Sequence, residues 1–100
     1  MLNRLMIAAA AVMLTSPLAV AGPIDSACMR SERAQSRQLC GCIQQVADQT
    51  LSRSDQRRAA RFFADADAAQ TVRMSKSDTD NAFWERYQNF ATTAEAYCAN

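Results

Sequence analysis

The chain contains no histidine, only two glycines and only two prolines. Histidine is the usual general base near neutral pH and a common zinc ligand, so its absence excludes His-dependent triads and most zinc sites. Proline stands only at positions 17 and 23, and glycine only at positions 22 and 41. The usual signals for hairpin turns are therefore missing, which argues against a β-sheet fold.

Large apolar side chains and net charge are also scarce beyond residue 21. Residues 22–100 hold only ten Leu, Ile, Val and Phe residues. A domain of this size rarely gains more than about 3–5 kcal/mol without cross-links. Ten basic and ten acidic residues balance over the same range, which leaves no long-range field to attract nucleic acid or an anionic membrane. We expect no nucleic-acid partner, and no membrane partner after signal cleavage.

The first 21 residues have the pattern of an export signal. Arg4 precedes an apolar run over residues 5–14, and Ala19-Val20-Ala21 supplies the small-x-small motif of signal peptidase sites. The apolar run is shorter than the roughly 20 residues of a membrane span. We expect cleavage between Ala21 and Gly22, a single mature domain over residues 22–100, and a periplasmic or secreted protein.

All four cysteines follow this signal: Cys28, Cys40, Cys42 and Cys98. An even number of cysteines in a short exported chain predicts disulfides, here two. A four-thiolate metal site would need the same cysteines, but an oxidising compartment favours disulfides and the Cys-Gly-Cys spacing is too short for ordinary zinc ligands. We expect no metal and no cofactor.

The remaining pattern predicts an all-α domain of three to four helices stapled by two disulfides. Alanine-rich helical segments cover residues 25–35, 36–51, 55–64, 67–74 and 79–98, and the first two segments are either separate or continuous. An aromatic stripe on the last segment predicts the main core face; as an alternative, it lines an apolar ligand groove. The stripe consists of Phe83, Tyr87, Phe90, Ala94 and Tyr97, with Trp84 beside it.

Helix geometry bears on the disulfide pairing. Residues two apart on a helix point about 200° apart, so Cys40 and Cys42 should not pair with each other. Cys42 shares a stripe with Leu39, Ile43 and Val46, and we expect it to face the core and pair with Cys98. Cys40 is expected to face away, with Ala47 and Leu51, and to pair with Cys28. The crossed alternative, Cys28–Cys42 with Cys40–Cys98, stays open.

A redox function is a second interpretation of Cys40 and Cys42. A disulfide closed within Cys-Gly-Cys would be strained and reducible, as in a periplasmic thiol–disulfide redox protein. Redox cysteines usually lie at a helix start, where the helix dipole lowers the thiol pKa. Here the motif lies inside a predicted helix, between Leu39 and Ile43, which favours the structural role.

Arginines recur every four residues at Arg53, Arg57 and Arg61, with Arg58 beside them. Such a row suits a phosphate, a carboxylate ligand or an acidic surface, because guanidinium groups bind these groups bidentately. The alternative is a solvated helix face. We take these four residues as the candidate binding site for a protein or small anionic partner, and no residues as catalytic.

Several segments resemble a family of short exported bacterial proteins with four cysteines, often labelled "arginine transporter". The resemblance lies in LCGCIQQVAD (39–48), TLSRSDQRRAA (50–60) with Phe62-Phe63, VRMSKSD (72–78), NAFW (81–84) and AEAYC (94–98). It implies no catalytic or ligand-binding residue. We therefore expect a small exported, non-enzymatic helical protein with a structural or partner-binding role, and the label adds an accessory role in arginine transport as an alternative.

Overall fold

The structure is a computed structural model that describes residues 22–31 and 36–99, so the predicted export signal lies outside the described residues. Five helices follow one another: α1 (Pro23–Arg30), α2 (Arg37–Thr50), α3 (Arg53–Ala64), α4 (Ala66–Arg73) and α5 (Asp78–Cys98). The described residues contain no strand. The all-α class with two disulfides is confirmed. The helices number five rather than three to four, because α1 and α4 are separate helices of eight residues each.

Four of the five helices begin at a side chain that caps the helix. The hydroxyl oxygens of Ser36, Ser52 and Ser77 each accept a hydrogen bond from the backbone N–H three residues later, and a carboxylate oxygen of Asp65 accepts one from Asp67. These bonds satisfy N–H groups that have no partner within the helix. The sequence contains two similar Ser-x-Ser-Asp segments, at residues 52–55 and 75–78. Both lie at helix starts, the first at α3 and the second at α5.

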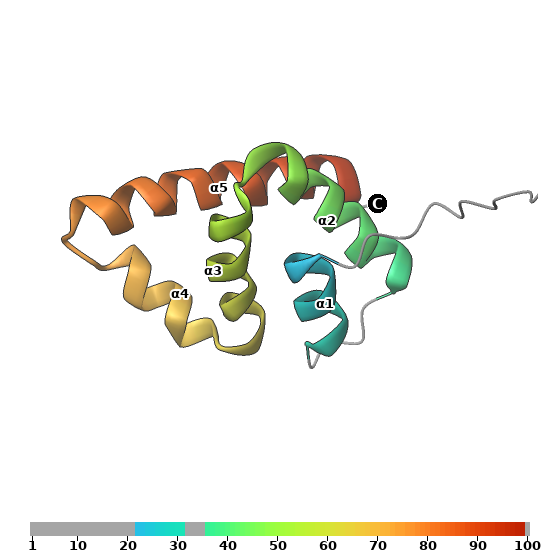
Figure 1. Cartoon of the computed structure of the whole chain (residues 1–100), viewed down its shortest axis with the longest axis horizontal. Helices are drawn as coiled ribbons and strands as arrows, with labels where there is room; N and C mark the ends of the chain where they lie inside the picture. The colour runs from blue at the N-terminus through green and yellow to red at the C-terminus, as the bar shows by residue number, and fades with distance from the viewer. Residues whose placement is uncertain (1–21, 32–35, 100) are drawn as a thin grey trace, which may run out of the picture.

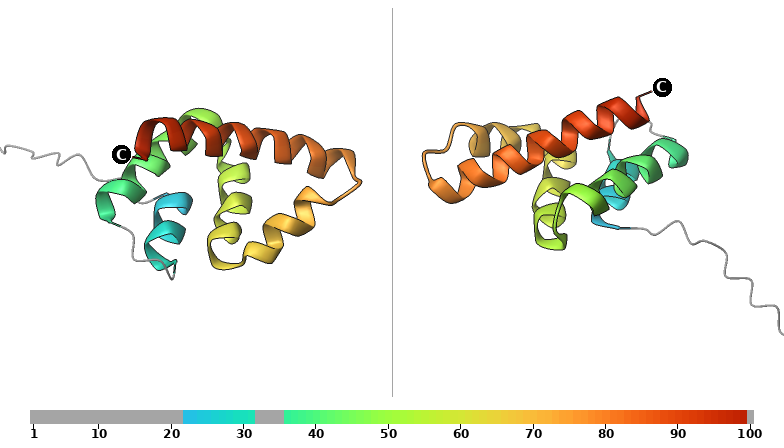
Figure 2. Two further views of the ribbon diagram at one scale, coloured as in Figure 1. Left: turned by 180° about the vertical axis from the view of Figure 1, so that it is seen from behind. Right: turned by 90° about the horizontal axis from the view of Figure 1, so that it is seen from above.

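Helix α5 runs along one side of the molecule and the other helices pack beneath it (Figure 1). The C-terminal half of α5 lies on α2, and its N-terminal half lies over α3 and α4. The short α1 fills the space between α2 and α3 and contacts both (Figures 1 and 2). Helix α1 thus covers a second side of α2, on the face that carries Cys40.

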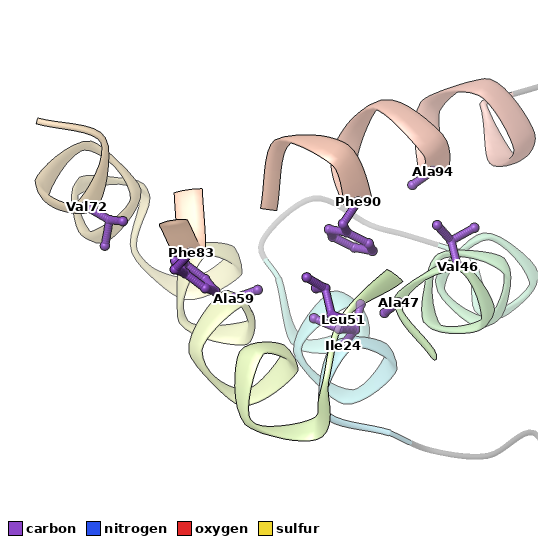
Figure 3. Close-up of a cluster of buried hydrophobic side chains, with 9 residues drawn as sticks. All are labelled: Ile24, Val46, Ala47, Leu51, Ala59, Val72, Phe83, Phe90 and Ala94. Carbon is purple, nitrogen blue, oxygen red and sulfur yellow. The ribbon is translucent and has the colours of Figure 1, made fainter. Parts of the chain in front are cut away.

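The apolar core is one cluster of buried side chains to which all five helices contribute (Figure 3). Phe90 and Ala94 of α5 lie over Ile24, Val46, Ala47 and Leu51, and Phe83 belongs to the same cluster with Ala59 of α3 and Val72 of α4. Phe83, Phe90 and Ala94 of the predicted stripe are buried, so the stripe forms the main core face of α5 as predicted.

Tyr97 is the exception in that stripe, because its side chain is 75% exposed. The expectation that it belongs to the core is wrong. The reason is the disulfide at the end of α5: Cys98 follows Ala94 by four residues and bonds to α2. Tyr97 is turned about 100° from Cys98 around the helix, so it does not follow Cys98 into the contact with α2 and instead lines an open hollow beside Leu39 and Cys42.

Candidate functional site

The two disulfides join α2 to both ends of the described chain. Cys28 of α1 bonds to Cys40, with 5.6 Å between the Cα atoms, and Cys42 bonds to Cys98 of α5, with 5.9 Å between them. This is the first of the two predicted pairings, and it is confirmed. Cys40 and Cys42 belong to different bridges, and no cysteine is free.

The predicted orientation of Cys40 is wrong. Cys40 and Ala47 are completely buried, and Leu51 is nearly so, although this face of α2 was expected to point away from the core. Helix α1 packs on this face, and α5 packs on the other. Cys42, on the face expected to be buried, is partly exposed.

Gln44 of α2 caps the start of α1. Gly22 is the N-cap residue of α1 and has no side chain with which to accept a hydrogen bond. Instead, the backbone N–H of Asp25 donates to Oε1 of Gln44 over 2.8 Å. Gln44 is only 2% exposed. A Cβ atom on Gly22 would lie 2.4 Å from Cδ of Gln44, so glycine at this position leaves room for the amide.

Gln56 of α3 caps the end of α2 in the same way. Its Nε2 donates to the carbonyl oxygens of Ala47 and Leu51, at 3.3 and 3.2 Å. Its Oε1 accepts from Nε2 of Gln44 at 2.8 Å, and Oδ1 of Asp48 accepts from both amides. We call Gln44, Asp48 and Gln56 the glutamine junction. It joins α1, α2 and α3 through two buried amides and the exposed carboxylate of Asp48. Both buried amides have hydrogen-bond partners, as stable interiors require.

One carboxylate oxygen beside this junction has no such partner. Asp25 is 5% exposed, and its Oδ1 is buried without a hydrogen bond in the described part of the chain. A buried carboxylate oxygen without a donor is costly. Sequence analysis missed both the junction and Asp25, because a lone glutamine or aspartate on a helix has the pattern of an ordinary surface residue.

The four arginines of the predicted binding site divide into two groups. Arg53, Arg57 and Arg61 are exposed on α3, and none of them forms an ion pair with a described residue. Arg58 is half-buried: it forms an ion pair with Asp80 of α5, and its guanidinium lies 4.4 Å from the centre of the Phe83 ring. Arg58 is therefore part of the fold, and the candidate binding surface consists of Arg53, Arg57 and Arg61. We call these three residues the arginine row.

A second ion pair joins the same two helices, with the arginine on α5 and the acid on α3. Arg86 of α5 donates from Nε and Nη2 to the two carboxylate oxygens of Asp55 in α3, at 2.6 and 3.1 Å. The hydrogen bond that Arg86 donates to Asp55 raises the pKa of Arg86. The hydrogen bond from Arg58 lowers the pKa of Asp80. These two pairs fix α3 against α5 on both sides of Phe83.

A shallow apolar groove of about 350 Å³ lies beside the Cys42–Cys98 bridge, with Leu39, Ile43 and Phe63 among its lining residues. A second hollow of about 470 Å³ adjoins it at Leu39 and Cys98. Ala94 is the one stripe residue that lines this groove, and Tyr97 lines the adjoining hollow. Phe83, Tyr87 and Phe90 line neither.

Comparison with protein families, curated proteins and solved structures finds no match to this chain. The resemblance to the four-cysteine family therefore stays a prediction. Within residues 22–31 and 36–99, no three His, Cys, Asp or Glu residues are grouped as a metal site. None of the described helices is both long and apolar enough to cross a bilayer.

Proposed function

We propose that this protein is a small exported, non-enzymatic helical domain that binds an acidic protein partner through the arginine row. The observation that carries the proposal is the contrast within α3. Arg58 has an acidic partner inside the fold, whereas Arg53, Arg57 and Arg61 are exposed and without one among the described residues.

Three acids, on α3, at its end and on α5, are already engaged. Asp55 binds Arg86, Asp80 binds Arg58, and Asp65 caps α4. Three guanidinium groups on successive turns, about 6 Å apart along the helix axis, therefore lack an internal counter-charge. A second protein supplies this counter-charge if its carboxylates repeat at the same spacing, as acids four residues apart on a helix do.

The disulfides support the proposed location. Disulfides persist in oxidising compartments and are rare in the cytosol, and all four cysteines are bonded here. We propose the periplasm or the outside of the cell, reached after signal cleavage between Ala21 and Gly22. The thiol–disulfide role of Cys40 and Cys42 and the accessory role in arginine transport stay alternatives that come from the sequence alone.

The test compares two double variants with the same change in charge. Arg57→Glu/Arg61→Glu reverses two charges of the row, and Arg37→Glu/Lys76→Glu reverses two exposed charges elsewhere. Tagged proteins are purified from the exported fraction and the co-purifying proteins are quantified by mass spectrometry. We expect the first variant to lose a partner at least tenfold and the second to retain it. An unchanged set of partners would refute the proposal.

A further inference from the structure

We infer that signal cleavage supplies a missing structural group: the α-ammonium group created at Gly22 forms an ion pair with the buried carboxylate of Asp25. This inference rests on the proposed cleavage between Ala21 and Gly22. It makes the new N-terminus a part of the fold and not merely an end of the chain.

The first step is the unpaired oxygen. Oδ1 of Asp25 is buried without a hydrogen-bond donor among the described residues. The amides nearby are fully used, because Nε2 of Gln44 donates to Asp48 and Gln56, and Nε2 of Gln56 donates to Asp48 and to carbonyl oxygens of α2. The glutamine junction therefore accepts the backbone N–H of Asp25 but offers its carboxylate no proton.

The second step is the position of Gly22. Gly22 is the N-cap residue of α1, and Asp25 is the third residue of that helix. An acidic side chain at this third position characteristically reaches back to the backbone nitrogen of the N-cap residue. Pro23, at the first helical position, has no N–H with which to compete. The nitrogen of Gly22 is thus the backbone donor that this helix position pairs with an acid at Asp25, although its amide N–H does not satisfy Oδ1 of Asp25 in the uncleaved chain.

The third step is the chemistry of cleavage. In the uncleaved chain the nitrogen of Gly22 is a neutral amide with one hydrogen. Hydrolysis of the Ala21–Gly22 peptide bond by water leaves a carboxylate on Ala21 and an amine on Gly22. The ordinary pKa of an α-amino group is about 7.7–8.0, so this amine is protonated at neutral pH and carries three donors. Cleavage thus converts the neutral N–H donor of Gly22 into a cation whose charge is opposite to that of the buried Asp25 carboxylate.

Surrounding groups favour the same pairing. At this junction α2 contributes the amide of Gln44 and the exposed carboxylate of Asp48, and α3 contributes the amide of Gln56, so the junction itself holds no cation that competes for Asp25. Asp25 also lies in the first turn of α1, where the helix dipole stabilises a carboxylate.

The experiment uses the exported, disulfide-bonded protein and a variant with one serine inserted between Ala21 and Gly22, so that cleavage after Ala21 leaves the amine one residue away. Each form is made with Asp25 and with Asp25→Asn. In the form that starts at Gly22, we expect Asp25→Asn to lower Tm by about 5 °C near pH 6.5. In the serine form it should change Tm far less. Equal losses in the two forms would overturn the inference.

A second readout separates an ion pair from a merely structural Asp25. NMR titration should give the Gly22 amine a pKa above its ordinary value, and Asp25→Asn should return it to that value. An ordinary pKa in the Asp25 form would also overturn the inference. Mass spectrometry reports the N-terminus first. If cleavage occurs elsewhere, the proposed processing is wrong, and the ion pair is then decided by the same measurements on a protein released at Gly22 from a fusion by a site-specific protease.

Discussion

Gln44 of α2 occupies the place of a helix cap for Asp25 of α1: its side-chain oxygen accepts the backbone N–H that a Ser or Asp at position 22 would ordinarily accept. The same amide donates to Gln56 and Asp48. Three helices thus share one buried polar centre, and the Cys28–Cys40 bridge fixes α1 against α2 nearby.

Replacing Gln44 tests this centre. We expect Gln44→Ala to lower the free energy of unfolding by about 2–4 kcal/mol, because buried groups of Asp25 and Gln56 lose their partners. The adjacent Gln45 is exposed, so Gln45→Ala should change it by less than about 0.5 kcal/mol. Urea unfolding curves give both values. Equal losses for the two variants would contradict the structural role of Gln44.

Alanine substitutions at the two glycines should change the stability of the fold in opposite directions. A Cβ atom on Gly22 would collide with the side chain of Gln44, whereas one on Gly41 would meet nothing within 4 Å. We expect Gly22→Ala to destabilise the fold by about 1–3 kcal/mol. Gly41→Ala should stabilise it by about 0.5–1 kcal/mol, since alanine is the better helix former.

Thermal unfolding of both variants measures these signs. A stable Gly22→Ala protein would show that Gln44 can move without cost. A destabilised Gly41→Ala protein would show that the helix around the cysteines needs a residue without a side chain.

The disulfides should open in a fixed order. Cys28 and Cys40 are buried, whereas Cys42 and Cys98 are partly exposed. With limited dithiothreitol we expect alkylation first at Cys42 and Cys98, identified by peptide mass spectrometry. Loss of this bridge should cost roughly 4 kcal/mol and loss of Cys28–Cys40 roughly 3, because the separations are 56 and 12 residues. Simultaneous labelling of all four cysteines in folded protein would contradict this order.

Acid should weaken the link between α3 and α5. Because the hydrogen bond from Arg58 lowers the pKa of Asp80 in the folded state, this carboxylate contributes stability above its ordinary pKa of 3.8. That contribution is lost as the pH falls through the lowered value. Tm measured from pH 7 to pH 2 should therefore fall less steeply at acid pH in Asp80→Asn than in the unaltered protein. Parallel curves would show that the pair contributes nothing.

Sequence patterns predicted the parts of the fold that depend on local chemistry. Helical segments predicted over residues 36–51, 55–64, 67–74 and 79–98 correspond to α2, α3, α4 and α5, and the angle between Cys40 and Cys42 on one helix separated their partners. The bridge from Cys40 to Cys28 was predicted, but the burial of Cys40 was missed because it depends on how closely α1 packs on that face of α2, which no local pattern encodes.

In the candidate site, too, the sequence predicted the local pattern but not the tertiary contacts. The four arginines were visible as a repeat, but only tertiary structure separates Arg58 from the others, since Asp80 lies 22 residues away. The roles of Gln44 and Gln56 had no signal in the sequence, because a glutamine that caps another helix has the pattern of any polar helix residue.

The central claim is that the exposed arginine row binds an acidic protein, whereas Arg58 belongs to the fold. Its most direct test is calorimetric titration of the co-purified partner with the Arg57→Glu/Arg61→Glu and Arg37→Glu/Lys76→Glu proteins, after circular dichroism has confirmed that both are folded. We expect a Kd at least tenfold weaker for the first protein, and binding by the second that weakens as salt screens the charges. Equal affinities for the two proteins would contradict it.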